Sequence, residues 1–153
     1  LGETQMTEAT QDRLNNLAGK LRSRGQRLTP QRLAVLKILA GNKAHLSIEE
    51  IHEIVKADFP MTSLATIYKT INMLKEIGEV REMGFSDGSN RYDGYDPSPH
   101  PHLICIKCSR IIDVDAADLA ELARIAARQS GYEIINQRLD FFGYCPDCQA
   151  EKN

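Results

Sequence analysis

Apolar residues recur every three or four positions through the first half of the chain, a spacing typical of amphipathic helices. The first predicted helix has its apolar face at Leu14, Leu17 and Leu21. Gly25 is expected to end it, because glycine readily takes the left-handed conformation that follows a helix. Thr29 and Pro30 predict the start of a second helix, which Gly41 stops. Its inward face is predicted to be Leu33, Leu36, Ile38 and Leu39.

Two more helices are predicted before the pattern changes. Ser47 and Glu50 have the spacing of a capping box, which indicates a helix that begins at once. Thr62 and Ser63 are candidate caps for a fourth helix, which Gly78 would end. The side chains of this helix expected to point inward are Leu64, Ile67, Ile71 and Leu74.

After Gly78 the apolar residues alternate with period two, which is typical of strands. The segments GEVREMGF and NRYDGY flank the turn-forming residues Ser86–Ser89, and together they predict a hairpin. Helices followed by a two-stranded wing form a winged helix-turn-helix domain, which we assign to residues 10–92. Residues 93–101 are rich in Gly, Pro and Asp and predict a hinge.

The second half is predicted to be a small α/β domain spanning residues 102–150, so the fold class of the whole chain is α+β. About 50 residues form a marginal core, so this domain needs a metal, a disulfide or a partner for stability. The expected elements are strands at 102–106 and 110–114, a helix at 115–129 and a strand at 132–142.

Charge is distributed unevenly along the 153 residues, although the net charge is only −2. Residues 13–40 hold seven Lys/Arg and no Asp/Glu, whereas residues 84–153 hold seven Lys/Arg against eleven Asp/Glu, or −4. A basic first half favours a polyanionic partner for that half, although solvated helix faces would give the same charges. No apolar run approaches the roughly 20 residues of a membrane span and no signal peptide is apparent, so we expect a cytoplasmic protein.

All four cysteines lie in two CxxC pairs, Cys105/Cys108 and Cys145/Cys148. Each pair places two thiolates on one side of a turn, and two pairs complete a tetrahedral zinc shell. The 36 intervening residues match the predicted strand–helix–strand, so a metal here would fasten the last strand to the first. A redox dithiol and disulfides are the alternatives. The first pair lies between strands rather than before a helix, and nothing indicates an oxidising compartment, so we favour structural zinc.

The same short segment carries two histidines. His100 and His102 are two residues apart, so on a strand they share a face, whereas Cys105 has the opposite parity. This geometry predicts a second site, distinct from the thiolates. Imidazoles with carboxylates would suit Fe(II), Mn(II) or Zn(II), and the nearby carboxylates are Asp93, Asp96 and Asp113. Incidental histidines in a polar loop remain the alternative, and His52 is expected simply to be solvated.

Four segments of the chain, RLTPQRLAVLKIL, AHLSIEEIH, SLATIYKTINMLKEIGEV with SNRYD, and HPHLICIKC with YCPDC, resemble the ferric-uptake-regulator family of metal-dependent transcription regulators. The resemblance implies a cytoplasmic homodimer with an N-terminal winged-helix DNA-binding domain and a C-terminal dimerisation domain with a four-cysteine zinc site. The expected partner is a palindromic double-stranded operator. No nucleophile–base pair, phosphate loop or paired catalytic carboxylate is visible in the sequence, so we do not expect an enzyme.

The resemblance also implies a regulatory site for Fe(II) or Mn(II) beside the structural Zn(II). Asp at position 113, where iron-sensing members often carry Glu, is similar to the peroxide-sensing branch. Many members of the family carry a histidine shortly before the final CxxC. The segment IINQRLDFFGYC has none, which weakens the case for a third metal site. The implied regulatory ligands are His45, Asp93, His100, His102 and Asp113.

These ligands come from both sides of the hinge, so one ion would tie the two domains together and favour the DNA-competent arrangement. We hypothesise that peroxide, reduced at bound Fe(II), oxidises His45 and His100 and thereby releases the repressor. An iron, zinc or nickel sensor of the same family that uses the metal as corepressor is the nearest alternative. A CxxC thiol oxidoreductase and a zinc-stabilised interaction module without sensing are alternatives of other classes.

DNA contacts are predicted on the outward face of the fourth helix and in the basic N-terminal segment. Tyr68 is suited to thymine methyl groups, although simple packing is its alternative role, and Lys69 to phosphate or guanine. The basic residues are expected to contact phosphate or the minor groove. The predicted helix contacts are Ser63, Ala65, Thr66, Tyr68, Lys69 and Asn72, and the predicted basic contacts are Lys20, Arg22, Arg24 and Arg27.

Overall fold

The computed structural model describes residues 6–85, 88–115 and 119–151. The chain divides into two compact units, Leu1–Pro97 and Ser98–Asn153, which we describe separately. Within the described residues, no helix has both the length and the apolar character needed to cross a bilayer.

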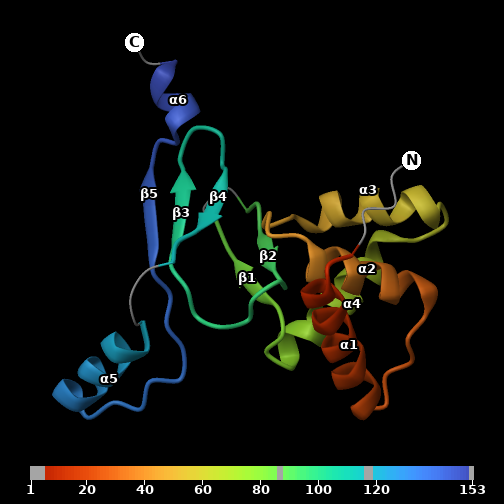
Figure 1. Ribbon diagram of the computed structural model, residues 1–153, viewed down its shortest axis with the longest axis horizontal. Coiled ribbons are helices and arrows are strands. Elements are labelled where there is room, and N and C mark those ends of the chain that lie inside the picture. Colours follow the sequence, from red (N-terminus) through yellow and green to blue (C-terminus); the bar gives the residue numbers. More distant parts are fainter. Residues whose placement is uncertain (1–5, 86–87, 116–118, 152–153) are drawn as a thin grey trace. The chain divides into compact units, whose positions relative to one another are not determined.

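The described residues of the first unit form four helices and a hairpin (Figure 1). Each helix begins where the sequence places a cap, and the side chains of Thr7, Thr29, Ser47 and Ser63 accept hydrogen bonds from backbone N–H groups of the first turns. The Ser47–Glu50 capping box is confirmed. The elements are α1 (Glu8–Ser23), α2 (Pro30–Gly41), α3 (Ile48–Asp58), α4 (Leu64–Glu76), β1 (Arg81–Met83) and β2 (Arg91–Asp93).

The core of this unit joins one face of each helix to the wing. Leu17, Leu36 and Ile71 are among its fully buried side chains. The prediction that Leu64 points inward is wrong, because it is the first residue of α4 and is 36% exposed. A helical side chain leans toward the N-terminus, and no helical turn precedes Leu64 for it to cover. Thr70 is buried on this face instead, and its hydroxyl donates to the carbonyl of Thr66 at 2.8 Å.

The wing is an antiparallel pair in which β1 and β2 are shorter than the predicted strands. Met83 lies opposite Arg91, and the N–H of Gly88 donates to the carbonyl of Phe85 at 3.0 Å. Residues 86 and 87 of the predicted turn lie outside the described residues. The N–H of Tyr92 donates to the carbonyl of Leu46 at 2.9 Å, which joins the segment before α3 to the wing.

The second unit is built on a three-stranded sheet in the order β4-β3-β5 (Figure 1). β3 pairs antiparallel with β4 and parallel with β5, so the last strand does lie beside the first. The short helix α6 was not predicted, although a proline after Cys145 is a signal for it. The elements are β3 (His102–Cys105), β4 (Ile111–Asp113), α5 (Leu119–Ser130), β5 (Asp140–Gly143) and α6 (Pro146–Ala150).

Two predicted elements of this unit are shorter than expected. The predicted strand at 132–142 forms only from Asp140 onward, where β3 offers a partner starting at His102. Pro99 and Pro101, which precede β3, have no backbone N–H to extend the ladder. The predicted helix at 115–129 is observed from Leu119, and residues 116–118 lie outside the described part.

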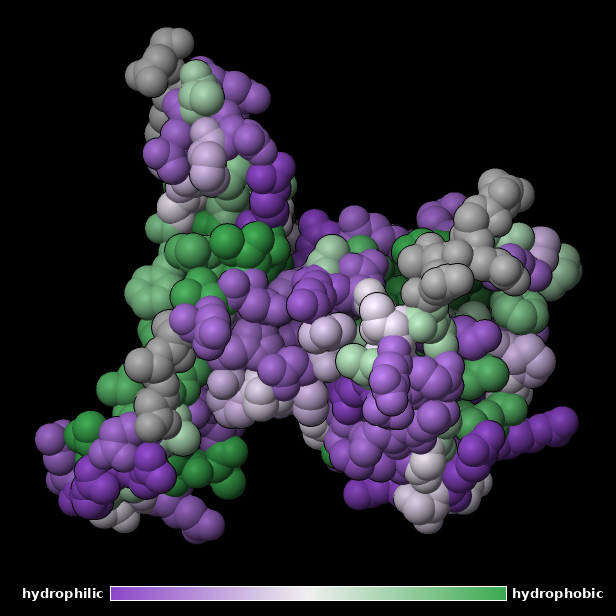
Figure 2. All heavy atoms as spheres, in the orientation of Figure 1, coloured by the Kyte–Doolittle hydropathy of each residue, from purple (hydrophilic) through white to green (hydrophobic). Residues whose placement is uncertain are grey.

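Hydrophobic side chains gather over the sheet of the second unit (Figure 2). This unit leaves many large apolar side chains accessible, and Ile135 is 94% exposed. The exposed apolar side chains of the three strands, and of the segment between α5 and β5, are Leu103, Ile112, Tyr132, Ile134, Ile135, Phe141 and Phe142. Leu103, Ile112 and Phe141 are paired in register across the three strands and so share one face of the sheet. An exposed apolar patch of this kind is typical of an interface with another chain.

Candidate metal centres

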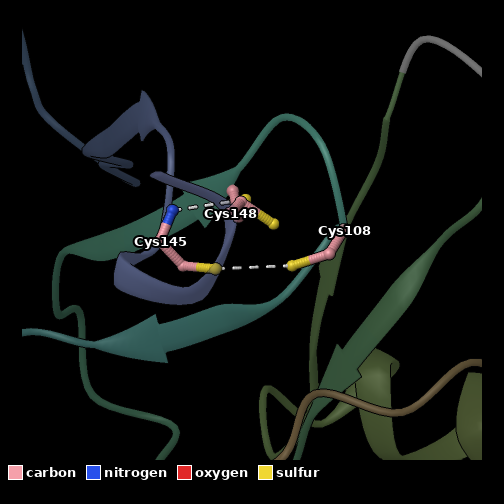
Figure 3. Close-up of side chains that lie close together, drawn as sticks. Cys108, Cys145 and Cys148 are labelled. Carbon is pink, nitrogen blue, oxygen red and sulfur yellow. Dashed lines mark hydrogen bonds between the residues drawn. The ribbon is translucent and has the colours of Figure 1, made fainter. Parts of the chain in front are cut away.

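The four cysteines converge where β3 ends and α6 begins. Figure 3 shows three of them, Cys108, Cys145 and Cys148. Cys105 is the last residue of β3, and Cys108 follows in the turn. Cys145 is the N-cap of α6 and Cys148 lies within that helix. The four sulfur atoms all lie within 4.8 Å of one another, and none of the four cysteines forms a disulfide.

The spacing of the sulfur atoms fits a tetrahedral metal rather than a disulfide. Cys108 Sγ and Cys145 Sγ are 3.7 Å apart. Thiolates at about 2.3 Å from a zinc ion lie about 3.8 Å from one another, whereas a disulfide requires about 2.05 Å. The four residues therefore fit structural Zn(II), which they would hold through sulfur alone.

The thiols already differ in acidity. Hydrogen bonds from the backbone of Cys145 and Cys108 lower the pKa of Cys105 to about 6. Burial, together with the neighbouring cysteines, raises the pKa of Cys148 to about 12. A bound zinc ion displaces such protons, so zinc uptake at this cluster releases protons to solvent.

The second unit also holds a group of imidazole and carboxylate side chains. His102 opens β3 directly opposite Asp113 of β4, and His100 precedes it by two residues. Asp113 Oδ1 lies 3.3 Å from His100 Nε2 and 3.7 Å from His102 Nε2. The two rings have centroids 4.7 Å apart. His100 lies in the irregular segment before β3, so the two histidines are not brought together by strand parity as predicted.

Sequence reasoning missed Asp140, the neighbour of His102 on its other side. Asp140 opens β5 opposite His102, and its Oδ1 lies 3.3 Å from His102 Nδ1. Its side chain is only 8% exposed. The sequence predicted that the last strand lies beside the first, and the register of that pairing, which the structure supplies, is what locates this residue.

The first unit brings together the two remaining predicted ligands. His45 and Asp93 are buried, and His45 Nε2 lies 3.7 Å from Asp93 Oδ2. Asp93 Oδ1 accepts the N–H groups of Tyr95, at 3.1 Å, and Asp96, at 3.4 Å. These bonds fix the carboxylate so that its second oxygen faces His45. Asp96, a candidate ligand, contributes its backbone N–H to this turn.

Each of the two imidazole–carboxylate groups has the spacing of metal ligands. Atoms bound about 2.2 Å from one ion lie about 3.1–3.6 Å apart at octahedral or tetrahedral angles. Within each unit the histidine nitrogens lie 3.3 to 3.7 Å from the carboxylate oxygen, within or just above this range. Nitrogen and oxygen donors of this kind suit Fe(II), Mn(II) or Zn(II). Two ligands from one unit, or three from the other, leave coordination positions open.

The predicted DNA-reading face of α4 is accessible. Ser63, Ala65, Tyr68, Lys69 and Asn72 are exposed, and Thr66 is partly so. A groove of about 520 Å³ lies at the start of α4. Its polar lining residues are Arg27, Thr29, Gln31, Arg32, Thr62, Ser63, Thr66 and Lys69.

Two features of this groove add to the prediction from sequence. Arg32, which lines the groove, was not predicted as a DNA contact, and the buried hydroxyl of Thr62 has no hydrogen-bond partner among the described residues.

Two other predictions change in the structure. His52 is not simply solvated, because its Nε2 lies 2.7 Å from the carbonyl of Thr62 and so holds the loop before α4. Lys20, a predicted DNA contact, pairs with Glu79.

A winged-helix unit followed by a unit with a four-cysteine cluster and a histidine–aspartate group defines a class of metal-dependent regulators. The sequence pattern of the ferric uptake regulator family matches residues 23–142, and the chain belongs to this family. It is 34% identical to the peroxide-responsive repressor PerR of Staphylococcus aureus over 142 residues, which cover 93% of this chain and 95% of that protein.

Solved structures agree with this assignment. The peroxide stress regulator of Campylobacter jejuni is 32% identical, with a TM-score of 0.69 over 88% of this chain and 98% of that one. The ferric uptake regulator of Helicobacter pylori shares the fold, with a TM-score of 0.76 at 23% identity over 95% of this chain and 97% of that one. The chain is therefore a metal-dependent transcriptional repressor of the ferric uptake regulator family, similar to peroxide-responsive repressors, and not an enzyme.

Proposed function

We propose that this repressor senses hydrogen peroxide through one regulatory ion held jointly by its two units. The observation that carries the proposal is that each unit presents an incomplete set of ligands with metal-like spacing. His45 and Asp93 are in the first unit, and His100, His102 and Asp113 are in the second. Only six residues separate Asp93 from His100, so a single ion that took all five ligands would restrain the hinge.

The switch follows from differential binding. An ion that contacts all five ligands stabilises the arrangement in which both units contribute. In any other arrangement the ion has fewer ligands and binds more weakly. To move the population from 1:99 to 99:1 the ion must bind the favoured arrangement about 10⁴-fold more tightly. Loss of one imidazole removes part of this preference, so the DNA-competent population falls.

Peroxide sensing requires the ligands themselves to react. Bound Fe(II) would supply the electrons that activate hydrogen peroxide beside the imidazoles, whereas Mn(II) would support DNA binding alone. In the net reaction one histidine ring gains an oxygen atom from hydrogen peroxide and water leaves. His45 and His100 are the proposed targets, and the four-cysteine zinc would remain bound throughout. Because oxidised imidazole is a poorer ligand, the restraint on the hinge is lost.

The proposed partner is a palindromic operator, bound by two copies of the chain. Regulators of this family bind operator DNA as dimers. The exposed apolar face of the second unit supports pairing of two copies there. A repressor works where the chromosome is, so we propose a cytoplasmic location. The groove at the start of α4 supports phosphate binding, because Arg27, Arg32 and Lys69 surround it.

An operator-binding assay with Fe(II) or Mn(II), each with and without peroxide, tests the proposal. We expect both metals to support binding, and peroxide to abolish it only with Fe(II). Mass spectrometry of the inactivated protein should show one added oxygen on a peptide that contains His45 or His100. Binding that resists peroxide with Fe(II) would indicate a corepressor sensor of iron, zinc or nickel instead. Oxidation confined to the cysteines would indicate thiol chemistry.

A further inference from the structure

His102 has carboxylates at both of its ring nitrogens. Nε2 faces Asp113 Oδ1 at 3.7 Å, on the side that also holds His100. Nδ1 faces Asp140 Oδ1 at 3.3 Å, on the opposite side of the ring. The two carboxylates come from the strands that flank β3, since Asp113 lies on β4 and Asp140 on β5. The imidazole is therefore held between them across the sheet.

Asp140 is itself held in place. Asp140 lies opposite His102 in the strand register, and its carboxylate contacts the imidazole ring of His102. The side chain of Asp140 is only 8% exposed. Its second oxygen, Oδ2, accepts a hydrogen bond from Arg138 Nε. The two oxygens of Asp140 therefore face an imidazole and a guanidinium. A carboxylate oxygen in such a contact accepts the hydrogen bond.

From this geometry we propose that Asp140 is a positioning residue, which keeps the proton of His102 on Nδ1 and presents the lone pair of Nε2 to the regulatory ion. A neutral imidazole carries one proton, and the acceptor at Nδ1 draws it there. Nε2 then has no proton to lose before it binds a metal. The contact also fixes the ring plane, so that His102 is oriented before the ion arrives.

Asp140 acts through His102 and not as a further ligand, because it lies on the Nδ1 side, away from Asp113. A carboxylate in this outer position fixes the tautomer and orientation of the imidazole, and its loss typically weakens metal binding 10- to 100-fold. The role in metal binding rests on the proposed regulatory site. The position of the proton does not, because it is set in the absence of the ion.

The test uses the full chain with zinc bound and the regulatory site free of metal. ¹⁵N-histidine NMR reports the protonated nitrogen of each ring, and the chain has only four histidines to assign. We expect His102 to carry its proton on Nδ1 in the wild type and to shift toward Nε2 protonation in Asp140→Ala. Mn(II) affinity should fall 10- to 100-fold in this variant, and Asp140→Glu should recover part of both properties.

Asp147→Ala is the matched control, because Asp147 is also paired with an arginine of this unit, Arg110 at 2.7 Å, but does not touch a histidine. It should leave both readouts unchanged. Wild-type affinity and an unchanged proton position in Asp140→Ala would overturn the proposal. Lost affinity with the proton still on Nδ1 would also overturn it, because the role would then be structural or that of a ligand. If His102→Ala left Mn(II) affinity intact, the regulatory site itself would be wrong.

Discussion

The buried carboxylate of Glu79 offers a sharp test of how the first unit is held together. Its side chain, 7% exposed, accepts hydrogen bonds from Arg13, at 2.6 Å, and from Lys20. Arg13 also donates to the carbonyls of Glu79, at 2.9 Å, and Gly94, at 3.0 Å. These contacts join α1 to the segment between α4 and β1 and to the residue after Asp93. We therefore expect Glu79→Gln to destabilise the unit.

The size of the effect follows from the contacts that glutamine would lose. The amide keeps one acceptor oxygen but removes the negative charge between two cations, and its NH₂ group faces a donor. Arg13, whose side chain is 14% exposed, then lacks its counter-charge. Losing one buried hydrogen bond between charged groups costs about 1.5–3 kcal/mol, so we expect a loss of this size at neutral pH.

The effect should depend on pH in a defined direction. Burial raises the pKa of Glu79, but hydrogen bonds from Lys20 and Arg13 outweigh it, so the net pKa lies below the ordinary value of 4.5. A carboxyl with a lowered pKa contributes stability that is fully present above its unfolded pKa and is lost as the pH falls through its folded pKa. The difference between wild type and Glu79→Gln should therefore shrink below about pH 4.5.

Urea unfolding followed by far-UV circular dichroism measures this difference at neutral pH and in steps below about pH 4.5. Glu76→Gln is the matched control, because Glu76 is an exposed residue of α4, and it should stay within about 0.5 kcal/mol of wild type. Changes in zinc binding at low pH affect all variants alike and cancel in the comparison. A Glu79→Gln variant as stable as the control, or a difference independent of pH, would refute the assigned ion pairs.

Three further changes test other parts of the structure. Cys148→Ser should release zinc and abolish amide protection in the second unit, while the helical core of the first unit stays protected; persistent protection of the sheet would contradict a structural metal. Gly94→Ala places a Cβ 2.8 Å from Leu39 Cβ, so urea unfolding should show a loss of about 1–3 kcal/mol, and no loss would mean that this contact relaxes freely. Lys69→Ala should reduce the slope of log K for operator binding against log salt concentration by about one counterion. Lys37→Ala is the control, because Lys37 lines a different groove, and it should leave this slope unchanged. Equal slopes in the two variants would remove Lys69 from the DNA interface.

Local signals in the sequence were sufficient to predict the helices of the first unit. Thr29, Ser47 and Ser63 are caps whose effect is confined to one turn, and the structure confirms each of them. The burial of Thr70 in place of Leu64 was not predictable in the same way, because it depends on where α4 begins relative to the core. Apolar periodicity alone does not fix that position.

In the second unit, several features depend on contacts between residues far apart in the sequence, which local patterns do not predict. Alternating apolar residues predicted a strand from Tyr132, but a strand needs a partner, and β3 offers one only from Asp140. The role of Asp140 beside His102 likewise depends on the register between two strands that are far apart in sequence. The cysteine spacing, by contrast, predicted directly that the sulfur atoms gather, because the two cysteines of each CxxC pair are only three positions apart.

The central claim is that one ion is ligated by His45 of the first unit together with His100 and His102 of the second. Pulsed EPR of the Mn(II) form, with ¹⁵N-labelled histidine, counts the imidazole nitrogens bound to the ion. We predict three nitrogens in the wild type and two in His45→Asn, with zinc still bound in both. An unchanged count in His45→Asn would contradict it, because the ion would then be held by the second unit alone.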